Sequence, residues 1–337
     1  MMNKNGMPPM GGMPPKGGMP PMGGMPPMGG MPPMEGSLRF EPGAGGPPQG
    51  FVPPMADISW VERKYLDVEY ATESPAQKID IYLPEEGDGP FPLLIHIHGG
   101  GFGLGDKRDD HMDVYLKGIL KGFAVASVEY RLSGEALFPA AVLDVREAVR
   151  FVRANAADYQ IDPTRIGVIG GSAGGNLAAM LAMNIPNGEF PGEEGKEICG
   201  DCSVKAAVDQ FGPTDFAVMD TMARENGVSF VDHDMPFSAE SSYLGGPLPE
   251  LDNAYIQQAN PMTYINDGMC PMLIQHGCLD KLVPYKQSVI FVDAIKEKLG
   301  EGRVEFDTLE TADHEDMQFR ADENMDRVWA WLDENLK

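Results

Sequence analysis

The chain has 337 residues, of which 42% are hydrophobic, and it carries a formal net charge of −25. Nucleic acids and anionic membranes attract basic surfaces, so this charge argues against both as partners. No apolar run approaches the roughly 20 residues that a membrane-spanning helix requires, and four cysteines are too few for a disulfide scaffold in a chain of this length.

The N-terminal residues 1–55 are dominated by Met, Pro and Gly, and much of this stretch repeats Met-Pro-Pro-Met-Gly-Gly. It has neither helix nor strand periodicity, which predicts a disordered tail before a domain at 56–337. It also lacks the continuous apolar core of a signal peptide, so we expect a cytoplasmic protein. The tail could be a solubilising segment, a protein-docking segment, or a Cu(I) site built from thioethers such as those of Met19, Met22, Met25 and Met28.

From residue 58 onward, short apolar runs alternate with amphipathic ones. The runs that read as strands are Lys78–Leu83, Pro92–Ile97, Phe123–Glu129, Arg165–Ile169, Val204–Phe211, Pro271–Gln275 and Val304–Leu309. The predicted helices cover Pro139–Ala157, Asn176–Met183, Tyr285–Leu299 and Asn324–Leu336. This alternation predicts an α/β fold whose central sheet is mostly parallel and has helices on both faces.

A run of three glycines follows the second of these strands, in His98-Gly99-Gly100-Gly101-Phe102. Without side chains, the backbone N–H groups of such a loop can approach a substrate carbonyl. The N–H groups of Gly100 and Gly101, with that of Ala173, are therefore candidates for an oxyanion hole. The competing interpretation, a phosphate-binding glycine loop, lacks the lysine and the glycine spacing of the known phosphate-binding motifs.

The strongest motif is Gly170-Gly171-Ser172-Ala173-Gly174, which lies between a predicted strand and a predicted helix. Flanking glycines permit the sharp turn that exposes a nucleophilic serine above the sheet, and the helix start supplies free amides to an oxyanion. Ser172 is the candidate nucleophile.

A segment at 213–263 interrupts the alternation with prolines and glycines, and we expect it to form an irregular lid or pocket wall. Four polar residues lie around the start of this segment: Asp209 and Gln210 just before it, and Thr214 and Asp215 within it. These polar groups are candidates for binding substrate hydroxyls, as Phe102 is for binding another part of the substrate. The alternative is that they only cap the end of a strand.

A serine nucleophile needs an imidazole base and an acid that orients it, in the chain order Ser, acid, His for this type of turn. Asp280 follows the strand Pro271–Gln275, and His314 follows the strand Val304–Leu309. Of the six histidines, at 96, 98, 111, 233, 276 and 314, only His314 has the right order and position. We expect Asp280 as the acid rather than Asp313 or Glu315, which are too close in sequence to reach the far nitrogen of the base.

Cys199 and Cys202 form a CxxC motif without a second one. Reduced thiols, a labile disulfide and half of a zinc site are the three interpretations, and the missing second pair favours reduced thiols.

Several motifs in fixed order resemble the α/β-hydrolase superfamily, in the branch of hormone-sensitive lipase and of bacterial acetyl xylan and feruloyl esterases. They are His98–Phe102, Glu129–Leu132, Phe138–Ala141, Gly170–Gly175, Ser238–Pro247, Pro261–Tyr264 and His276–Asp280. The resemblance implies an α/β-hydrolase fold and a serine carboxylic-ester hydrolase that forms an acyl-enzyme on short acyl esters, with no metal and no cofactor. It also implies a small-molecule or oligosaccharide ester as substrate, for example an acetyl or feruloyl ester of a plant-type carbohydrate.

Two other functions are open at this point. One is a peptidase of the prolyl-oligopeptidase type, although the tail is too short to build that family's propeller domain. The other is a small-molecule-binding protein on the same fold without catalysis. The oligomeric state is open as well, a homodimer being one option.

Overall fold

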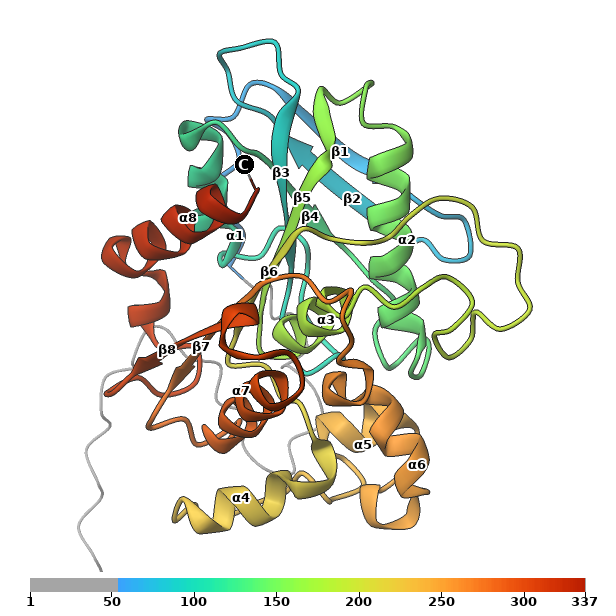
Figure 1. Ribbon diagram of the computed structural model, residues 1–337, viewed down its shortest axis with the longest axis vertical. Helices are drawn as coiled ribbons and strands as arrows, with labels where there is room; N and C mark the ends of the chain where they lie inside the picture. Colours follow the sequence, from blue (N-terminus) through green and yellow to red (C-terminus); the bar gives the residue numbers. More distant parts are fainter. Residues whose placement is uncertain (1–53, 337) are drawn as a thin grey trace, which may run out of the picture. The chain divides into compact units, whose positions relative to one another are not determined.

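The computed structural model describes residues 54–336, and the predicted tail therefore lies almost wholly outside the described residues (Figure 1). Its strands form one sheet in the order β1-β2-β4-β3-β5-β6-β7-β8. The strands are β1 (Lys64–Glu69), β2 (Lys78–Tyr82), β3 (Phe91–Ile97), β4 (Ala124–Val128), β5 (Ile161–Gly171), β6 (Ala206–Gln210), β7 (Met272–Gly277) and β8 (Val304–Leu309). From β4 to β8 neighbouring strands are parallel, whereas β2 is antiparallel to β1 and to β4.

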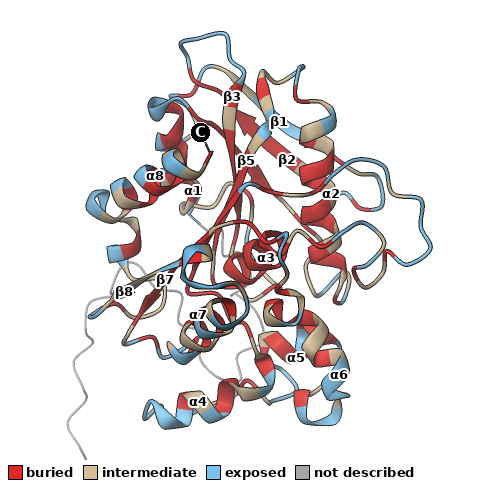
Figure 2. Cartoon of the chain, viewed as in Figure 1, coloured by how far each residue is buried: buried red, intermediate tan, exposed pale blue. Residues whose placement is uncertain are grey.

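Helices cover both faces of the sheet, as the sequence predicts. They are α1 (Met112–Leu116), α2 (Ala140–Ala154), α3 (Ala173–Ala182), α4 (Met219–Glu225), α5 (Ala239–Leu244), α6 (Asn253–Ile256), α7 (Lys286–Leu299) and α8 (Asp322–Leu336). Helices α2, α3 and α7 share one apolar core with Leu93 and Ile95 of β3, while α1 and α8 share the other with Leu94. Alternate residues of a strand point to opposite faces, so β3 contributes to both cores and is buried (Figure 2).

The strands and long helices lie close to their predicted ranges, but three features differ. The predicted strands do not include β1. β5 begins at Ile161, four residues before the predicted strand Arg165–Ile169, and includes Asp162 and Pro163. The segment 213–263, expected to be irregular, contains α4, α5, α6 and several short 3-10 helices, because its prolines and capping side chains start and stop single turns. Within residues 54–336, no helix is both long enough and apolar enough to span a bilayer.

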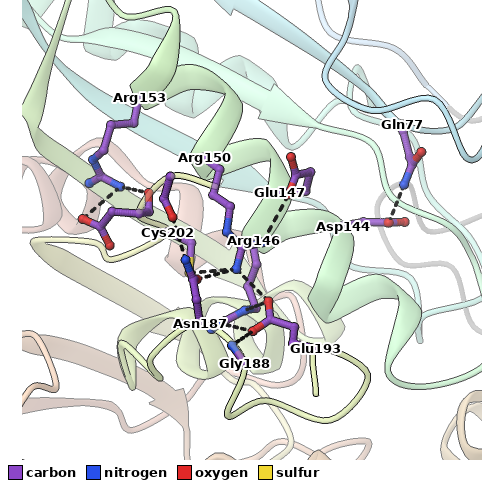
Figure 3. Close-up of polar contacts among 12 residues, drawn as sticks. Gln77, Asp144, Arg146, Glu147, Arg150, Arg153, Asn187, Gly188, Glu193 and Cys202 are labelled. Atoms are coloured by element: carbon purple, nitrogen blue, oxygen red, sulfur yellow. Dashed lines mark hydrogen bonds and ion pairs between the residues drawn. The ribbon is translucent and has the colours of Figure 1, made fainter. Parts of the chain in front are cut away.

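A buried ion cluster joins α2 to the segment between α3 and β6 (Figure 3). The carboxylate of Glu193 accepts hydrogen bonds from Nε and Nη2 of Arg146, at 2.9 and 2.8 Å, and from Nη2 of Arg150 at 2.6 Å. Arg150 also donates to Sγ of Cys202, 3.5 Å away. Cys202 is buried, Cys199 is exposed, and both are free thiols in this structure.

Candidate active site

The predicted nucleophile lies at the junction of β5 and α3. Ser172 has φ 54° and ψ −122°, a backbone conformation that L-residues rarely adopt. Its N–H donates to the carbonyl of Gln210 at 2.9 Å, and its own carbonyl accepts from the N–H of Asn176. A Cβ on Gly174 would lie 2.1 Å from the carbonyl oxygen of Ile97, so only glycine lets α3 start this close to β3. The strained turn is therefore held by its neighbours on both sides.

Ser172, His314 and Asp280 form one hydrogen-bonded chain at the carboxyl ends of β5, β8 and β7. Oγ of Ser172 lies 3.0 Å from Nε2 of His314, and Nδ1 of His314 lies 2.7 Å from Oδ2 of Asp280. These are the distances at which a serine can pass its proton to an imidazole that a carboxylate holds in place. The structure thus brings together the three residues that sequence order selected.

The Asp280 carboxylate is held from several directions. Its Oδ1 accepts from the backbone N–H groups of Leu282 and Val283, at 2.9 and 2.8 Å, and its Oδ2 also accepts from Nε2 of His276 at 3.2 Å. Burial by itself would raise the pKa of Asp280, but the facing His314 and the bond from His276 bring that pKa below its usual range. The acid therefore stays ionised at neutral pH.

Charged groups surround the imidazole of His314. Burial disfavours the imidazolium of His314, whereas the carboxylates of Asp280, Glu315 and Asp313 favour it, and the pKa of His314 is raised above its ordinary value. The Phe211 ring meets the imidazole edge to face, with 4.9 Å between centroids. Phe211 has φ 47°. No sequence signal points to Phe211, because its contact depends on a backbone conformation that its residue type does not predict.

Glu315 is the rival acid that sequence position offers. Nδ1 of His314 contacts the carboxylate of Asp280 instead. The backbone of Glu315 has φ 54°. A Cβ built on Gly99 would lie 3.6 Å from Cβ of Ser172 and 3.7 Å from Oε1 of Glu315. The Glu315 carboxylate therefore lies against the glycine loop, on the side where Ser172 also packs.

The glycine loop after β3 makes a turn that requires glycine. Gly100 and Gly101 have φ values of 100° and 58°, and a Cβ on Gly100 would lie 2.4 Å from the carbonyl oxygen of Leu104. Among residues 54–336, no backbone acceptor is paired with the N–H groups of Gly100 and Gly101. Ala173 is the first residue of α3, where an N–H has no partner within the helix. The role of these three N–H groups as oxyanion donors therefore stays a prediction.

The candidates for substrate binding are engaged inside the protein. The Phe102 ring is buried and stacks on Tyr243, with 3.9 Å between centroids. Gln210 accepts from the hydroxyl of Tyr115 and donates to Gln275, at 2.8 and 2.9 Å. Asp215 accepts from the N–H of Ala217 and from Gln257, at 3.1 and 3.0 Å.

The other two polar candidates are also occupied. Asp209 is fully buried and accepts from the N–H of Gly212 at 2.9 Å, and burial raises its pKa to about 6. Thr214 is buried and bonds to Gln287. The contacts of these residues favour the alternative in which they cap the end of β6 and support the segment that follows it.

In the described part of the chain, one group of side chains could supply ligands to a metal ion. Asp109, Asp110 and His111 place one ligand atom each within 4.8 Å of one another, in the loop before α1. Asp110 pairs with Arg320 at 3.3 Å, and Nδ1 of His111 lies 3.3 and 3.5 Å from the two carboxylates. These internal pairs account for the cluster without a cation.

The chain matches the BD-FAE family over residues 79–295, which include Ser172, Asp280 and the glycine loop. It belongs to that family. Among its relatives is "Esterase LipQ" of Mycobacterium tuberculosis, 30% identical over 251 residues, which are 74% of this chain and 56% of LipQ. "Carboxylesterase NlhH" of the same species is 37% identical over 125 residues, 36% of this chain and 38% of NlhH. Three curated relatives, LipQ among them, match 66–74% of this chain. The chain spans only about half the length of each of them.

Solved structures agree with the fold. One described as a truncated carbohydrate esterase from gut microbiota is 28% identical, with a TM-score of 0.72 over 84% of this chain and 99% of that one. An acetyl ester-xyloside bifunctional hydrolase from Caldicellulosiruptor lactoaceticus is 20% identical, with a TM-score of 0.59 over 85% and 98% of the two chains. The predicted resemblance to α/β-hydrolase esterases, and the predicted fold, are confirmed.

Proposed function

We propose that this BD-FAE family protein is a serine carboxylic-ester hydrolase that cleaves short acyl esters, above all acetyl esters of carbohydrates, through an acyl-enzyme. The observation that carries the proposal is the hydrogen-bonded chain from Ser172 through His314 to Asp280, with distances of 3.0 and 2.7 Å. The alternative function, a small-molecule-binding protein that does not catalyse a reaction, would not need such an arrangement.

The proposed reaction has two halves. Oγ of Ser172 attacks the ester carbonyl while Nε2 of His314 takes its proton, and Asp280 keeps the Nδ1–H tautomer and stabilises the imidazolium. The tetrahedral oxyanion accepts hydrogen bonds from the N–H groups of Gly100, Gly101 and Ala173. His314 then protonates the departing alcohol. In the second half, water attacks the acyl carbonyl while His314 takes a proton from it, and His314 returns this proton to Oγ of Ser172 as the carboxylic acid leaves.

Two observations support the proposed substrate: a similar solved structure and the geometry beside the glycine loop. The neighbour described as a carbohydrate esterase is similar along nearly its whole length, which supports a sugar ester. The oxyanion loop is also closed on one side, because a Cβ on Gly101 would lie 3.0 Å from Cβ of Ala239. A small acyl group such as acetyl suits a site whose wall stands this close to the oxyanion donors.

The test is acetate release from acetylated xylo-oligosaccharides beside hydrolysis of p-nitrophenyl acetate and methyl ferulate. We expect hydrolysis of the sugar ester with kcat/KM at least comparable to that for the activated ester. Hydrolysis of p-nitrophenyl acetate alone would retain the esterase chemistry and refute the sugar. Cleavage of prolyl p-nitroanilides with no ester hydrolysis would favour the peptidase.

A further inference from the structure

His98 is a buried histidine whose two ring nitrogens both face acceptors. It follows β3, and its Nδ1 lies 2.9 Å from the carbonyl oxygen of Gly99, while Nε2 lies 3.2 Å from Oε1 of Glu129. Residues Ile97 and Val128 are paired in the parallel β3–β4 ladder, so the next residues, His98 and Glu129, emerge side by side. The imidazole also stacks on Tyr130, with 4.3 Å between centroids and an angle of 12°.

A neutral imidazole has one N–H and one lone pair, so it can donate to only one of these partners. A backbone carbonyl is an acceptor only, and so is an ionised carboxylate. We propose that His98 is doubly protonated throughout the working pH range, and that this imidazolium is a positioning residue that aims the N–H of Gly100 into the oxyanion hole.

The alternative is a neutral His98 facing a protonated Glu129. Two contacts oppose it. The other oxygen of Glu129 accepts from the backbone N–H of Lys107 at 3.1 Å, and Nζ of Lys107 lies 4.0 Å from it. Burial would raise the pKa of Glu129, but His98 and Lys107 bring it below its usual value. The carboxylate is therefore ionised and needs a donor from the ring.

The remaining charges around His98 point the same way. Burial disfavours its charged form, but Glu129 and Asp109 favour it, and the pKa of His98 is raised. His96, two residues earlier, adds no competing positive charge because burial lowers its pKa to about 3. The ammonium of Lys107 is drawn to Asp67, at 3.1 Å, as well as to Glu129.

The route from His98 to the oxyanion hole is one peptide bond. The carbonyl of Gly99 and the N–H of Gly100 belong to the same planar, trans peptide, so they point in opposite directions. A hydrogen bond from Nδ1 of His98 to the Gly99 carbonyl therefore fixes where the Gly100 N–H points. Glycines flank this peptide on both sides, and Gly100 has φ 100°. Among the described residues, the only other donor to the Gly99 carbonyl is the hydroxyl of Tyr130, which lies 3.5 Å away and donates at 2.9 Å to the carbonyl of His98.

Loss of one proton from His98 has a specific consequence. The remaining N–H stays with Glu129, because a hydrogen bond to a carboxylate is the stronger one. The Gly99 carbonyl then faces a lone pair, and the peptide rotates away together with the Gly100 N–H. Removal of one oxyanion donor typically lowers kcat by about 10²–10³-fold. We therefore expect kcat to fall at alkaline pH while KM changes little.

The first test does not depend on activity. The full-length protein is labelled with ¹⁵N-histidine, and the ring signals of His98 are assigned by their loss in His98→Asn. At about pH 7.5, both nitrogens of His98 should carry a proton. A spectrum of a single neutral tautomer for His98 would overturn the proposal.

The second test links the charge to turnover and rests on the proposed ester hydrolysis. Glu129→Gln should move the alkaline fall in kcat for p-nitrophenyl acetate to lower pH by at least about one unit, with KM within about threefold. Glu135→Gln, which removes an exposed carboxylate from the same segment, should leave the profile unchanged. His98→Asn keeps a neutral donor and should abolish the alkaline fall.

The outcomes separate the two proposals. An unmoved alkaline limb in Glu129→Gln would refute positioning by His98 even if the ring proves doubly protonated. Wild-type protein without any esterase activity would refute the proposed function and leave the spectroscopic result on His98 intact. If the variants fail to fold, the ring signals of His98 in the wild-type protein are assigned through their couplings to the backbone of the same residue, and this spectrum still decides the charge state.

Discussion

Nε2 of His314 lies 3.0 Å from Oγ of Ser172, although the two residues are 142 positions apart in the sequence. β5 ends at Gly171, immediately before Ser172, and β8 ends at Leu309, just before the loop that carries His314. The parallel strands between β5 and β8 bring the two loops to the same edge of the sheet, with Asp280 on the loop after β7. Each residue can be tested separately, because its proposed role differs.

Ser172→Ala and His314→Ala should each lower kcat for p-nitrophenyl acetate by several orders of magnitude, because the nucleophile and its base act as a unit. Steady-state kinetics on purified variants measures the effect. Ser59→Ala, at an exposed serine remote in sequence, is the control and should keep full activity. Near-wild-type turnover by Ser172→Ala would refute the assignment.

Asp280→Asn should lower kcat less, by about 10²–10⁴-fold, because an amide still holds the imidazole but favours the wrong tautomer. Only the neutral imidazole accepts a proton, so wild-type activity should rise as pH passes the raised pKa of His314. Without the carboxylate this pKa falls, and the acid limb of the kcat/KM profile should move to lower pH. A shift of the acid limb to higher pH would contradict the account in which the Asp280 carboxylate raises the pKa of His314.

Glu315→Gln should move the same acid limb to lower pH without lowering the plateau of kcat greatly. The Glu315 carboxylate favours the His314 imidazolium, so its removal lowers the pKa of the base. pH profiles of kcat/KM for Glu315→Gln and for the control Glu310→Gln, at an exposed residue, measure this. Identical profiles in all three proteins would mean that Glu315 does not act on the base.

Asp209→Asn should stabilise the protein at neutral pH. Asp209 is fully buried, one of its oxygens has no hydrogen-bond partner within residues 54–336, and its pKa is raised to about 6. The folded state binds this proton more tightly than the unfolded state, so wild-type stability is lost as pH rises from about 4 through 6. The variant should gain about 1–3 kcal/mol above that range and nothing below it.

Urea unfolding at several pH values measures the effect of Asp209→Asn. Asp88→Asn, at an exposed residue, is the matched control. Destabilisation of Asp209→Asn that is present above about pH 6 and absent below it would mean that Asp209 is needed as a charged group.

Glu193→Gln should lower the free energy of unfolding by about 3–5 kcal/mol, because it leaves two buried guanidinium groups without their shared carboxylate. Burial would raise the pKa of Glu193, but Arg146 and Arg150 lower it. This contribution is therefore present above the unfolded-state pKa and is lost as pH falls through the folded one. Chemical unfolding beside the exposed-site control Glu194→Gln tests it; equal stability of the two variants would contradict the role of the cluster.

Local patterns predicted much of the fold and of the candidate site. The turns around Ser172 and Gly100 are visible in the sequence because glycine is required at positive φ and at close approach. The strand β1 was not predicted, since it lies at the edge of the sheet and its residues are mostly exposed, so it has no apolar run. The pairing of His98 with Glu129 was not predicted either, because it depends on the register of β3 against β4.

The predicted substrate contacts are a different case, because the structure favours the alternative in which these polar residues have a structural role. Asp209 and Gln210 follow a core strand, and such positions often face a ligand in parallel sheets. Here both side chains are buried, and they bond to neighbouring backbone and side chains. Only the packing of the surrounding segments decides this, and it has no counterpart in local sequence patterns.

The most direct test of the central claim is the identity of the residue that a fluorophosphonate modifies. The full-length protein is treated with a stoichiometric amount, its residual esterase activity is followed, and the adduct is mapped by peptide mass spectrometry. We expect one adduct per chain, on Ser172, in step with the loss of activity, and none in His314→Ala on the same timescale. An adduct on another residue, or full inactivation with Ser172 unmodified, would contradict the account.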